Sequence, residues 1–409
     1  MNTLKYEKIF AFSILLTTIF SINPWCRIPI GNLYLEWLTI FIIFFFLFYY
    51  IKQNHLFKAP EYRILSIYLV YVFIQIVRGV FIADNYWEYK QLIDGGFALL
   101  VPLLIYYFAD PYRLSYIFRY WFKYAFVLLG FFYVWNLHQS SYCFYFAPVL
   151  FIGCFIPCIK GKWKYTILIS VLVLLIIAPY ARSQTIKAFM CLLMSLLILY
   201  KKHISTSLIK ILHWGCYIIT IVLLVLGLSG KYNVFDDIEK KDRFHSDFTQ
   251  QNLNEDTRST IYIEVLTSSI KNNYIIWGRS PARGNDSQTF GKIIEKQTNT
   301  GRLERHSNEV GSLNIFTWMG IIGVILYLFL FLRSSYLAVY KSNNFYIKIV
   351  GFYIAFRWLY SWIEDFNRFD IMNISLFAMV AMGYSEAIRN MSNVEFKKWI
   401  NSFLPKRVL

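Results

Sequence analysis

Long apolar segments recur along most of the chain, and they constrain its fold more than any other feature. Most are about 17 to 22 residues long, and an α-helix of about 20 apolar residues spans the roughly 30 Å hydrocarbon core of a bilayer. Of the 409 residues, 57% are hydrophobic and only 16% are charged, which is more apolar surface than a soluble core of this length would bury. The sequence therefore predicts an all-α, polytopic membrane protein.

We expect about twelve transmembrane helices. Ten or eleven are the alternatives, because proline interrupts the segments around Pro148, Pro157 and Pro179 and frees backbone groups that neighbouring helices must satisfy. The expected segments cover residues 9–22, 33–51, 64–83, 93–109, 120–137, 142–159, 164–180, 185–200, 211–229, 310–332, 346–364 and 371–388. The chain thus divides into three parts: N-terminal helices (1–229), a large loop (230–309), and C-terminal helices with a basic tail (310–409).

The distribution of Lys and Arg predicts the orientation. With the N-terminus placed inside, 22 of these residues lie at the termini and in the hairpins of the inner face. The short loops of the other face carry four, namely Arg27, Lys90, Arg182 and Arg368. The positive-inside rule therefore predicts that both termini are cytoplasmic and that the large loop is external. Since the cations are scattered over separate segments, the net charge of +17 does not predict a nucleic-acid partner.

Three cations lie within the predicted segments, where each costs about 2.5 to 3.5 kcal/mol at a helix centre. They are Arg78, Lys187 and Arg357; all three lie in the outer half of the membrane, and Arg182 lies at the same outer edge. Taken singly, each has a structural explanation, either snorkelling to the headgroups or pairing with acidic residues at that edge. Their common placement instead favours a cationic, outward-opening cavity for an anionic lipid headgroup such as a diphosphate.

The large loop is about 80 residues long and holds 12 basic and 12 acidic residues. Loops of this length are usually functional or disordered. Order is expected in its second half, where Asp256 can cap an amphipathic helix. The W-G-R-S-P-A-R-G turn that follows places Arg279 and Arg283 beside glycines, where the backbone can approach a ligand closely. Both arginines are therefore candidate substrate contacts.

Three features between Pro179 and Leu332 resemble the bacterial O-antigen polymerase and O-antigen ligase superfamily. The A-R-S containing Arg182 is similar to the family's arginine at a helix end, and the D-T-R-S-T-I-Y containing Arg258 resembles the start of the loop's amphipathic helix. R-H-S-N-E-V-G-S-L-N-I-F-T-W-M-G-I-I-G resembles the return of the loop to the membrane, with a polar residue ahead of a G-x-x-G that opens the next helix. The ligase register for a His falls here on Glu309, and His306 lies one helical turn earlier, which favours a polymerase over a ligase.

The resemblance implies a GT-C-like glycosyltransferase of the bacterial inner membrane, with its active site facing the periplasm. Such a polymerase transfers a growing glycan from undecaprenyl diphosphate to the non-reducing end of a lipid-linked repeat unit of O-antigen, capsule or exopolysaccharide. A chain-length regulator protein is a further candidate partner, beside membrane lipid. Catalytic roles are implied for Arg258 and for either His306 or Glu309 as the base. The candidate contacts to diphosphate and sugar are Arg182, Lys187, Arg279, Arg283, Arg78 and Arg357.

Enzymes of similar architecture carry an acidic pair on the first external loop, whereas that loop here reads N-P-W-C-R-I-P-I-G. No Cys/His spacing resembles a zinc site either. We therefore expect cofactor-free, metal-independent and inverting transfer, in which arginines stabilise the departing diphosphate. Two alternatives stay open: a ligase that uses a lipid A-core acceptor, and a flippase or secondary transporter. Transporters usually show an internal repeat and a midplane site, and no repeat is evident in this sequence.

Overall fold

The described part of the protein is mostly helical. The structure, a computed structural model, describes residues 3–138, 141–177, 182–228, 257–288 and 290–405; it does not describe the side chains at 3–5, 182, 226–228 and 257–258. The helices up to residue 228 are α1 (Thr3–Ser21), α2 (Leu33–Gln53), α3 (Arg63–Ile82), α4 (Tyr86–Leu100), α5 (Leu104–Phe108), α6 (Pro111–Trp121), α7 (Gly130–Asn136), α8 (Tyr142–Tyr145), α9 (Ala147–Gly153), α10 (Lys162–Ile177), α11 (Arg182–Leu199) and α12 (Thr206–Leu228).

The second half of the chain contains the only two strands of the described residues. Its helices are α14 (Thr257–Lys271), α15 (Gly291–Thr298), α16 (Gly311–Tyr340), α17 (Phe345–Tyr360), α18 (Ile371–Tyr384), α19 (Glu386–Asn390) and α20 (Asn393–Asn401). The strands β1 (Asn285–Asp286) and β2 (Glu304–Arg305) pair in antiparallel register. We call residues 257–310 the loop region. The upstream part of the predicted large loop, up to Asp256, lies outside the described residues.

Seven helical stretches of the described chain are long and apolar enough to cross a membrane. They are Tyr6–Trp25, Leu33–Gln53, Pro60–Ile82, Tyr86–Phe108, Pro111–Asn136, Thr206–Val225 and Gly311–Tyr340. These stretches are consistent with the predicted all-α membrane protein. The other five expected segments correspond to shorter or interrupted helices, so the number of crossings stays a prediction.

Proline explains why one expected segment, 142–159, is broken into pieces. Pro148 lies in the first turn of α9, and Pro157 lies in the first turn of a 3-10 helix, Ile156–Cys158. Proline has no N–H and fixes φ near the helical value, so it starts a helix well but interrupts one that precedes it. Each proline therefore begins a new short element.

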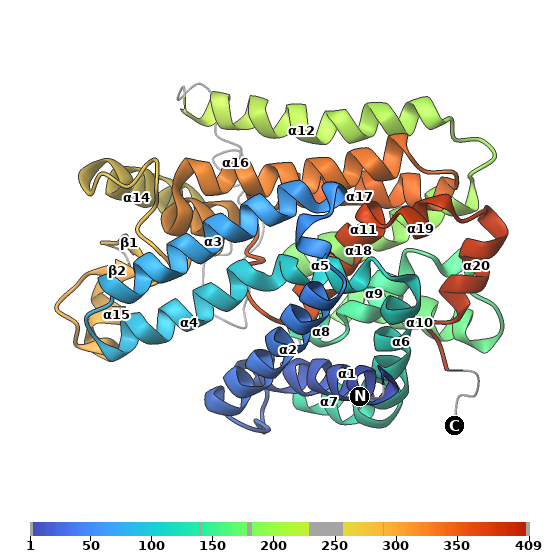
Figure 1. Ribbon diagram of the computed structural model, residues 1–409, viewed down its shortest axis with the longest axis horizontal. Coiled ribbons are helices and arrows are strands. Elements are labelled where there is room, and N and C mark those ends of the chain that lie inside the picture. Colours follow the sequence, from blue (N-terminus) through green and yellow to red (C-terminus); the bar gives the residue numbers. More distant parts are fainter. Residues whose placement is uncertain (1–2, 139–140, 178–181, 229–256, 289, 406–409) are drawn as a thin grey trace.

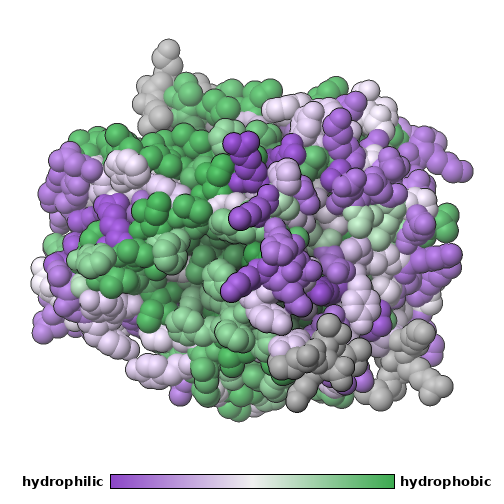
Figure 2. All heavy atoms as spheres, viewed as in Figure 1, coloured by the Kyte–Doolittle hydropathy of each residue, from purple (hydrophilic) through white to green (hydrophobic). Residues whose placement is uncertain are grey.

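The surface shows the division that a membrane protein requires. Hydrophobic residues form a band across the molecule, and hydrophilic residues gather at its two ends (Figure 2). One end carries α14, α15, β1 and β2, and the opposite end carries α19 and α20 (Figure 1). Between these ends all 14 residues of α18 are buried. α16 packs against α17, α18 and α3, while α12 lies at the edge of the bundle beside α17.

The G-x-x-G motif lies where two helical parts of α16 meet. α16 begins nine residues before Gly320, with Val310 as its N-cap, and Gly320 interrupts it with φ 65° and ψ −169°. A positive φ is accessible to glycine at little cost. The motif therefore marks a break inside α16, and its first glycine is the residue that permits the break.

Candidate functional site

Residues 361–370, which link α17 to α18, fold back into the bundle and hold the first turn of α16. The N–H groups of Gly311 and Ser312 donate to the carbonyls of Glu364 and Ser361, each at 3.0 Å. The hydroxyls of Ser312 and Ser361 lie 2.7 Å apart. Because the first N–H groups of a helix lack partners within it, these bonds fix the start of α16 against the segment.

Two cations converge on one carboxylate in this segment. Lys187 of α11 places Nζ 2.5 Å from Glu364 Oε1, and Arg357 of α17 places an Nη 3.6 Å from Glu364 Oε2. Lys187 is 4% exposed and Arg357 is 3% exposed. We call Lys187, Arg357 and Glu364 the cationic cluster. Two positive groups of the cluster thus share one carboxylate, and the buried Asp370 lies within electrostatic range of Lys187.

Arg357 is the least satisfied member of the cationic cluster. Its guanidinium makes no hydrogen bond to any described residue, and its Nε is buried without a partner. A buried Oε1 of Gln184, one turn before Lys187 on α11, likewise has no partner among the described residues. Most buried polar groups in proteins are hydrogen-bonded, so a buried guanidinium without a hydrogen bond to the described residues is a candidate ligand contact. Phosphate oxygens fit a guanidinium and an ammonium.

α14 reaches the same segment from the loop region. The Tyr262 hydroxyl donates to the carbonyl of Trp362 at 2.6 Å, and Ile261 and Val265 pack against Val310 and Leu313 of the α16 start. α11 and α14 thus both contact residues 361–364. Arg182 and Arg258 belong to the first turns of these two helices.

Arg182 and Arg258 stand at these helix beginnings, and their side chains lie outside the description. Arg182 is the first residue of α11, five positions before Lys187. Arg258 is the second residue of α14, four positions before Tyr262. At 1.5 Å per residue the axial separations are roughly 7.5 and 6 Å. The substrate and catalytic roles expected of Arg182 and Arg258 stay predictions.

His306 and Glu309, the alternative bases, precede α16 and differ in environment. His306 is half-buried, its carbonyl accepts from the indole of Trp318 at 3.2 Å, and its Nδ1 has no hydrogen-bond partner among the described residues. Burial lowers the pKa of His306 below 6.5. Glu309 is exposed and lies 3.4 Å from Arg305. A neutral imidazole with a free nitrogen fits the role of a proton acceptor, and the choice between the two stays a prediction.

Hydrogen bonds between asparagine side chains link the end of the loop region to residues 361–370. Asn308 donates its N–H to Asn314 Oδ1 at 2.6 Å, and Asn314 donates to Asp365 Oδ1 at 3.2 Å. Asn308 also donates to Asn285 Oδ1 of β1 at 3.0 Å. Sequence reasoning missed these asparagines, because a lone Asn in a loop carries no recognisable signal. Sequence reasoning did name Glu364 or Asp365 as the partner of Arg357, and the structure shows the pair with Glu364. It missed that Lys187 pairs with the same carboxylate.

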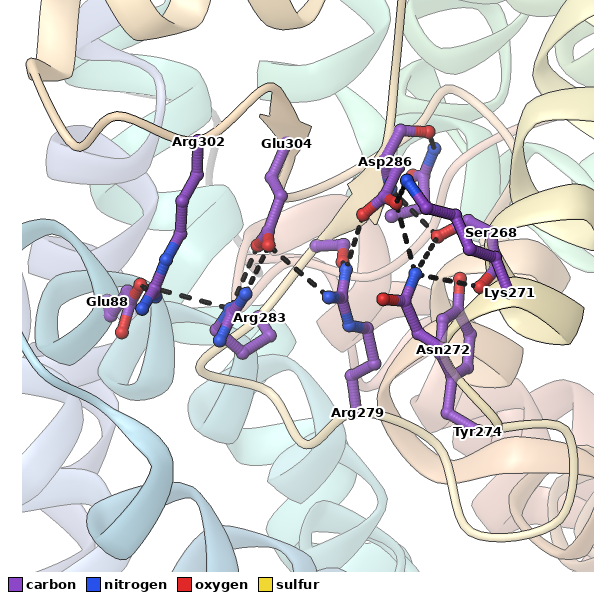
Figure 3. A network of polar contacts seen from close by, with 12 residues as sticks. Glu88, Ser268, Lys271, Asn272, Tyr274, Arg279, Arg283, Asp286, Arg302 and Glu304 are labelled. Atoms are coloured by element: carbon purple, nitrogen blue, oxygen red, sulfur yellow. Dashed lines mark hydrogen bonds and ion pairs between the residues drawn. The ribbon is translucent and has the colours of Figure 1, made fainter.

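Arg279 and Arg283 belong to an ion-pair network that holds the loop region together (Figure 3). Arg279 lies 3.0 Å from Asp286 and 3.4 Å from Glu304. Arg283 pairs closely with Glu304 and lies 3.8 Å from Glu88 of α4. Each therefore has carboxylate partners of its own, which a substrate would have to share, and their predicted contact with substrate stays untested.

Arg78 also has partners outside the cationic cluster. Its guanidinium donates to the carbonyls of Trp277 and Gly278 at 3.1 and 2.8 Å, and to the side chain of Gln75 at 3.1 Å. Of the intramembrane cations, Lys187 and Arg357 thus share one site around Glu364, whereas Arg78 is bound to the backbone of the loop region.

Within the described ranges, no three His, Cys, Asp or Glu side chains are grouped so as to hold a metal ion. Comparison of the chain with protein-family models, with curated proteins and with solved structures finds no match.

Proposed function

We propose that this chain is a membrane-embedded polysaccharide polymerase that transfers a growing glycan from undecaprenyl diphosphate to the non-reducing end of a lipid-linked repeat unit. The single observation that carries the proposal is the cationic cluster, in which a buried guanidinium without a hydrogen bond to the described residues and a buried ammonium share one carboxylate. A bound anion would offset the cost of burying both cations. A lipid diphosphate supplies that anion at membrane depth.

The chemistry of transfer explains why positive charge is useful there. As the glycosidic bond to the diphosphate breaks, negative charge grows on the leaving phosphate. Fixed cations in a water-poor site stabilise that charge more in the transition state than in the ground state. Lys187 and Arg357 would meet the diphosphate from within the bundle, and Arg182 would meet it at the start of α11.

The acceptor hydroxyl requires a base on the side of the loop region. His306 fits this role because its lowered pKa keeps the imidazole neutral near pH 7 and its Nδ1 is free of partners among the described residues. Glu309 is the alternative. Arg258, at the start of the helix that docks beside Trp362, would orient the diphosphate or the sugar next to it.

The decisive experiment is chain extension by the purified protein in liposomes. The substrate is the lipid-linked repeat-unit pool extracted from the producing cells, and the readout is a ladder of lipid-linked products on a gel. Arg357→Gln is expected to suppress the ladder. Lys348→Gln, which removes a cation from the other end of α17, is the matched control and is expected to leave it intact. Normal ladders from both Arg182→Ala and Arg258→Ala would count against the assigned site.

The same preparation separates the alternatives. A ligase would leave the lipid-linked units unextended and would attach them to added lipid A-core. A flippase or transporter would move labelled lipid-linked units across sealed vesicles without forming any new glycosidic bond.

A further inference from the structure

A short apolar segment of the loop region, residues 275–278, lies beside the transmembrane bundle at a depth that an ordinary external loop would not reach. The Trp277 ring is centred 6.3 Å from the ring of Tyr71 on α3. Tyr71 precedes the end of α3 at Ile82 by eleven residues, which is roughly 16 Å along a helix axis. The distance along α3 from Tyr71 to Ile82 thus measures how far the segment lies from the end of the helix.

α16 also contacts the segment, at Gly320 and Ile321. The N–H of Ile321 donates to the carbonyl of Ile275 at 2.8 Å. A Cβ built on Gly320 would lie 2.1 Å from the carbonyl oxygen of Ile276, so the two backbones touch at this point. Gly320 is nine residues into α16, or roughly 13 Å from its start. Measured along α3, the segment thus lies about three helical turns from the helix end, and it contacts α16 at the break.

Three of the four carbonyls of the segment, those of Ile275, Trp277 and Gly278, accept hydrogen bonds within the protein. Arg78 donates to the carbonyls of Trp277 and Gly278, and the N–H groups of Arg279 and Ser280 donate to the carbonyls of Thr317 and Trp318. The Tyr71 hydroxyl donates to the carbonyl of Met319 at 2.8 Å, next to the break in α16. Irregular backbone at membrane depth is tolerated only when such groups are satisfied without water.

The side chains of the segment have the opposite character, because they are apolar and exposed. Ile276 is 54% exposed and Trp277 is 56% exposed. α3, which Trp277 meets at Tyr71, also carries exposed apolar residues, namely Ile67, Val70, Phe73, Ile74, Val77, Val80 and Phe81. Carbonyls that are mostly paired within the protein, together with outward apolar side chains, are the pattern of a lipid-facing surface.

We propose that residues 275–278 form a re-entrant wedge whose Ile276 and Trp277 side chains contact acyl chains of the bilayer leaflet on the side of α14 and α15. Arg78 is the residue that holds this wedge, since it donates to two of its carbonyls from within α3. The wedge continues the lipid-facing surface of α3 and lies apart from the cationic cluster, so it does not depend on the proposed glycosyl transfer.

Spin labels on single introduced cysteines test the wedge in liposomes of phosphatidylethanolamine and phosphatidylglycerol. Ile276→Cys carries the label, Phe73→Cys is the lipid-facing reference on α3, and Lys296→Cys is the water-facing reference on α15. The described native cysteines are buried except Cys26, and the wild-type chain gives their labelling background. We expect the ratio of oxygen to nickel-chelate accessibility at 276 to match that at 73 and to exceed that at 296 several-fold.

Two further measurements make the proposal specific. A ratio at 276 equal to that at 296 would overturn it. The proposal would also be overturned if nickel-chelate access at 276 fell only after undecaprenyl phosphate was added. The segment would then bind a prenyl chain and not the acyl chains of the bilayer. Arg78→Gln in the Ile276→Cys background is expected to raise nickel access at 276 several-fold, with Arg78→Lys intermediate. Unchanged access in Arg78→Gln would contradict the role given to Arg78.

Discussion

Lys187 Nζ lies 2.5 Å from Glu364 Oε1, and this contact ties α11 to the segment between α17 and α18. Arg357 approaches the other oxygen of the same carboxylate at 3.6 Å. One negative charge therefore holds two positive charges in a buried site, and it does so without a hydrogen bond to Arg357. Glu364 therefore has a structural role and a role in the proposed chemistry. It stabilises Lys187 and Arg357, and the diphosphate would bind the same two cations.

The first prediction concerns the stability that Glu364 provides. Glu364→Gln is expected to lower the free energy of unfolding by about 3 to 5 kcal/mol, because it leaves Lys187 and Arg357 buried without their counter-charge. Adding Lys187→Met should recover part of that loss. Thermal unfolding in detergent, followed by intrinsic fluorescence, measures both effects. Strictly additive effects of the two substitutions would contradict a direct pairing. Glu61→Gln, at an exposed site, is the control.

Catalysis should distinguish charge from geometry at Arg357. Arg357→Gln is expected to reduce the rate of chain extension about 100-fold, as is typical when one donor to a developing negative charge is removed. Arg357→Lys should retain part of the rate, since an ammonium keeps the charge but lacks the fork of N–H donors. The measurement is the initial rate at saturating lipid-linked substrate. Equal rates for wild type and Arg357→Gln would remove Arg357 from the site.

Much of this architecture could be predicted from the sequence, because each helix has to satisfy its own backbone and hide its polar groups from lipid. Apolar length alone located the helical segments, and the cost of charge in lipid drew attention to Lys187 and Arg357. The long-range partners of these charged residues could not be predicted in the same way. Lys187 and Glu364 are 177 residues apart, and only the docking of α11 against the 361–370 segment brings them together.

Arg78 and Gly320 show two different limits of sequence reasoning. Arg78, like Arg357, is a cation within a predicted transmembrane segment. It donates to the carbonyls of Trp277 and Gly278, and no local sequence pattern reveals these partners. Gly320 belongs to a motif that indicates close approach of backbone, but the motif does not name the approaching segment. The sequence therefore indicates which single residues are unusual, such as a charge in an apolar segment or a glycine in a motif. It does not reveal which distant residues they contact.

The lowered pKa of His306 predicts an unusual response to acid. In the unfolded chain His306 takes up a proton near pH 6.5, whereas burial keeps the folded imidazole neutral to lower pH. The stability associated with neutral His306 is therefore complete above pH 6.5 and is lost as the pH falls from 6.5 towards the folded pKa. His306→Asn should flatten this part of the profile, which unfolding midpoints measured between pH 5 and 8 would reveal.

If His306 is the base, the pH dependence of activity should follow the folded pKa. Chain extension by the wild type should hold its rate below pH 6.5, because the imidazole stays deprotonated there. His306→Asn should be slow at every pH, and Glu309→Gln should be close to wild type. The reverse result, with Glu309→Gln slow and His306→Asn active, would assign the base to Glu309.

Glu88 is expected to fasten the loop region to α4. This carboxylate is 1% exposed, pairs closely with Arg302, and lies 3.8 Å from Arg283. Glu88→Gln should release the loop region locally without unfolding the bundle, since the helices retain their own contacts. Limited proteolysis is expected to cut between α14 and α16 several-fold faster in Glu88→Gln than in the wild type. Glu295→Gln, on α15, should show the wild-type rate of cutting; equal rates for all three proteins would contradict the role of Glu88.

The last prediction concerns the contact between the α16 break and the wedge. Gly320→Ala should be strongly destabilising, because a Cβ there would lie 2.1 Å from the carbonyl oxygen of Ile276 and because φ is 65°. Neither problem can be relieved by rotating a side chain, since the obstacle is backbone. Gly215→Ala on α12 is the matched control, with no atom within 4 Å of its Cβ and a helical backbone.

Helix propensity should make Gly215→Ala neutral or slightly stabilising, by up to about 1 kcal/mol. Gly320→Ala should instead lower the unfolding temperature and increase nickel-chelate access to a label at position 276, because the added methyl group pushes the wedge away from α16. A fall in the unfolding temperature without any change at 276 would mean that the two backbones are not in contact, and that the left-handed conformation of Gly320 alone explains the loss.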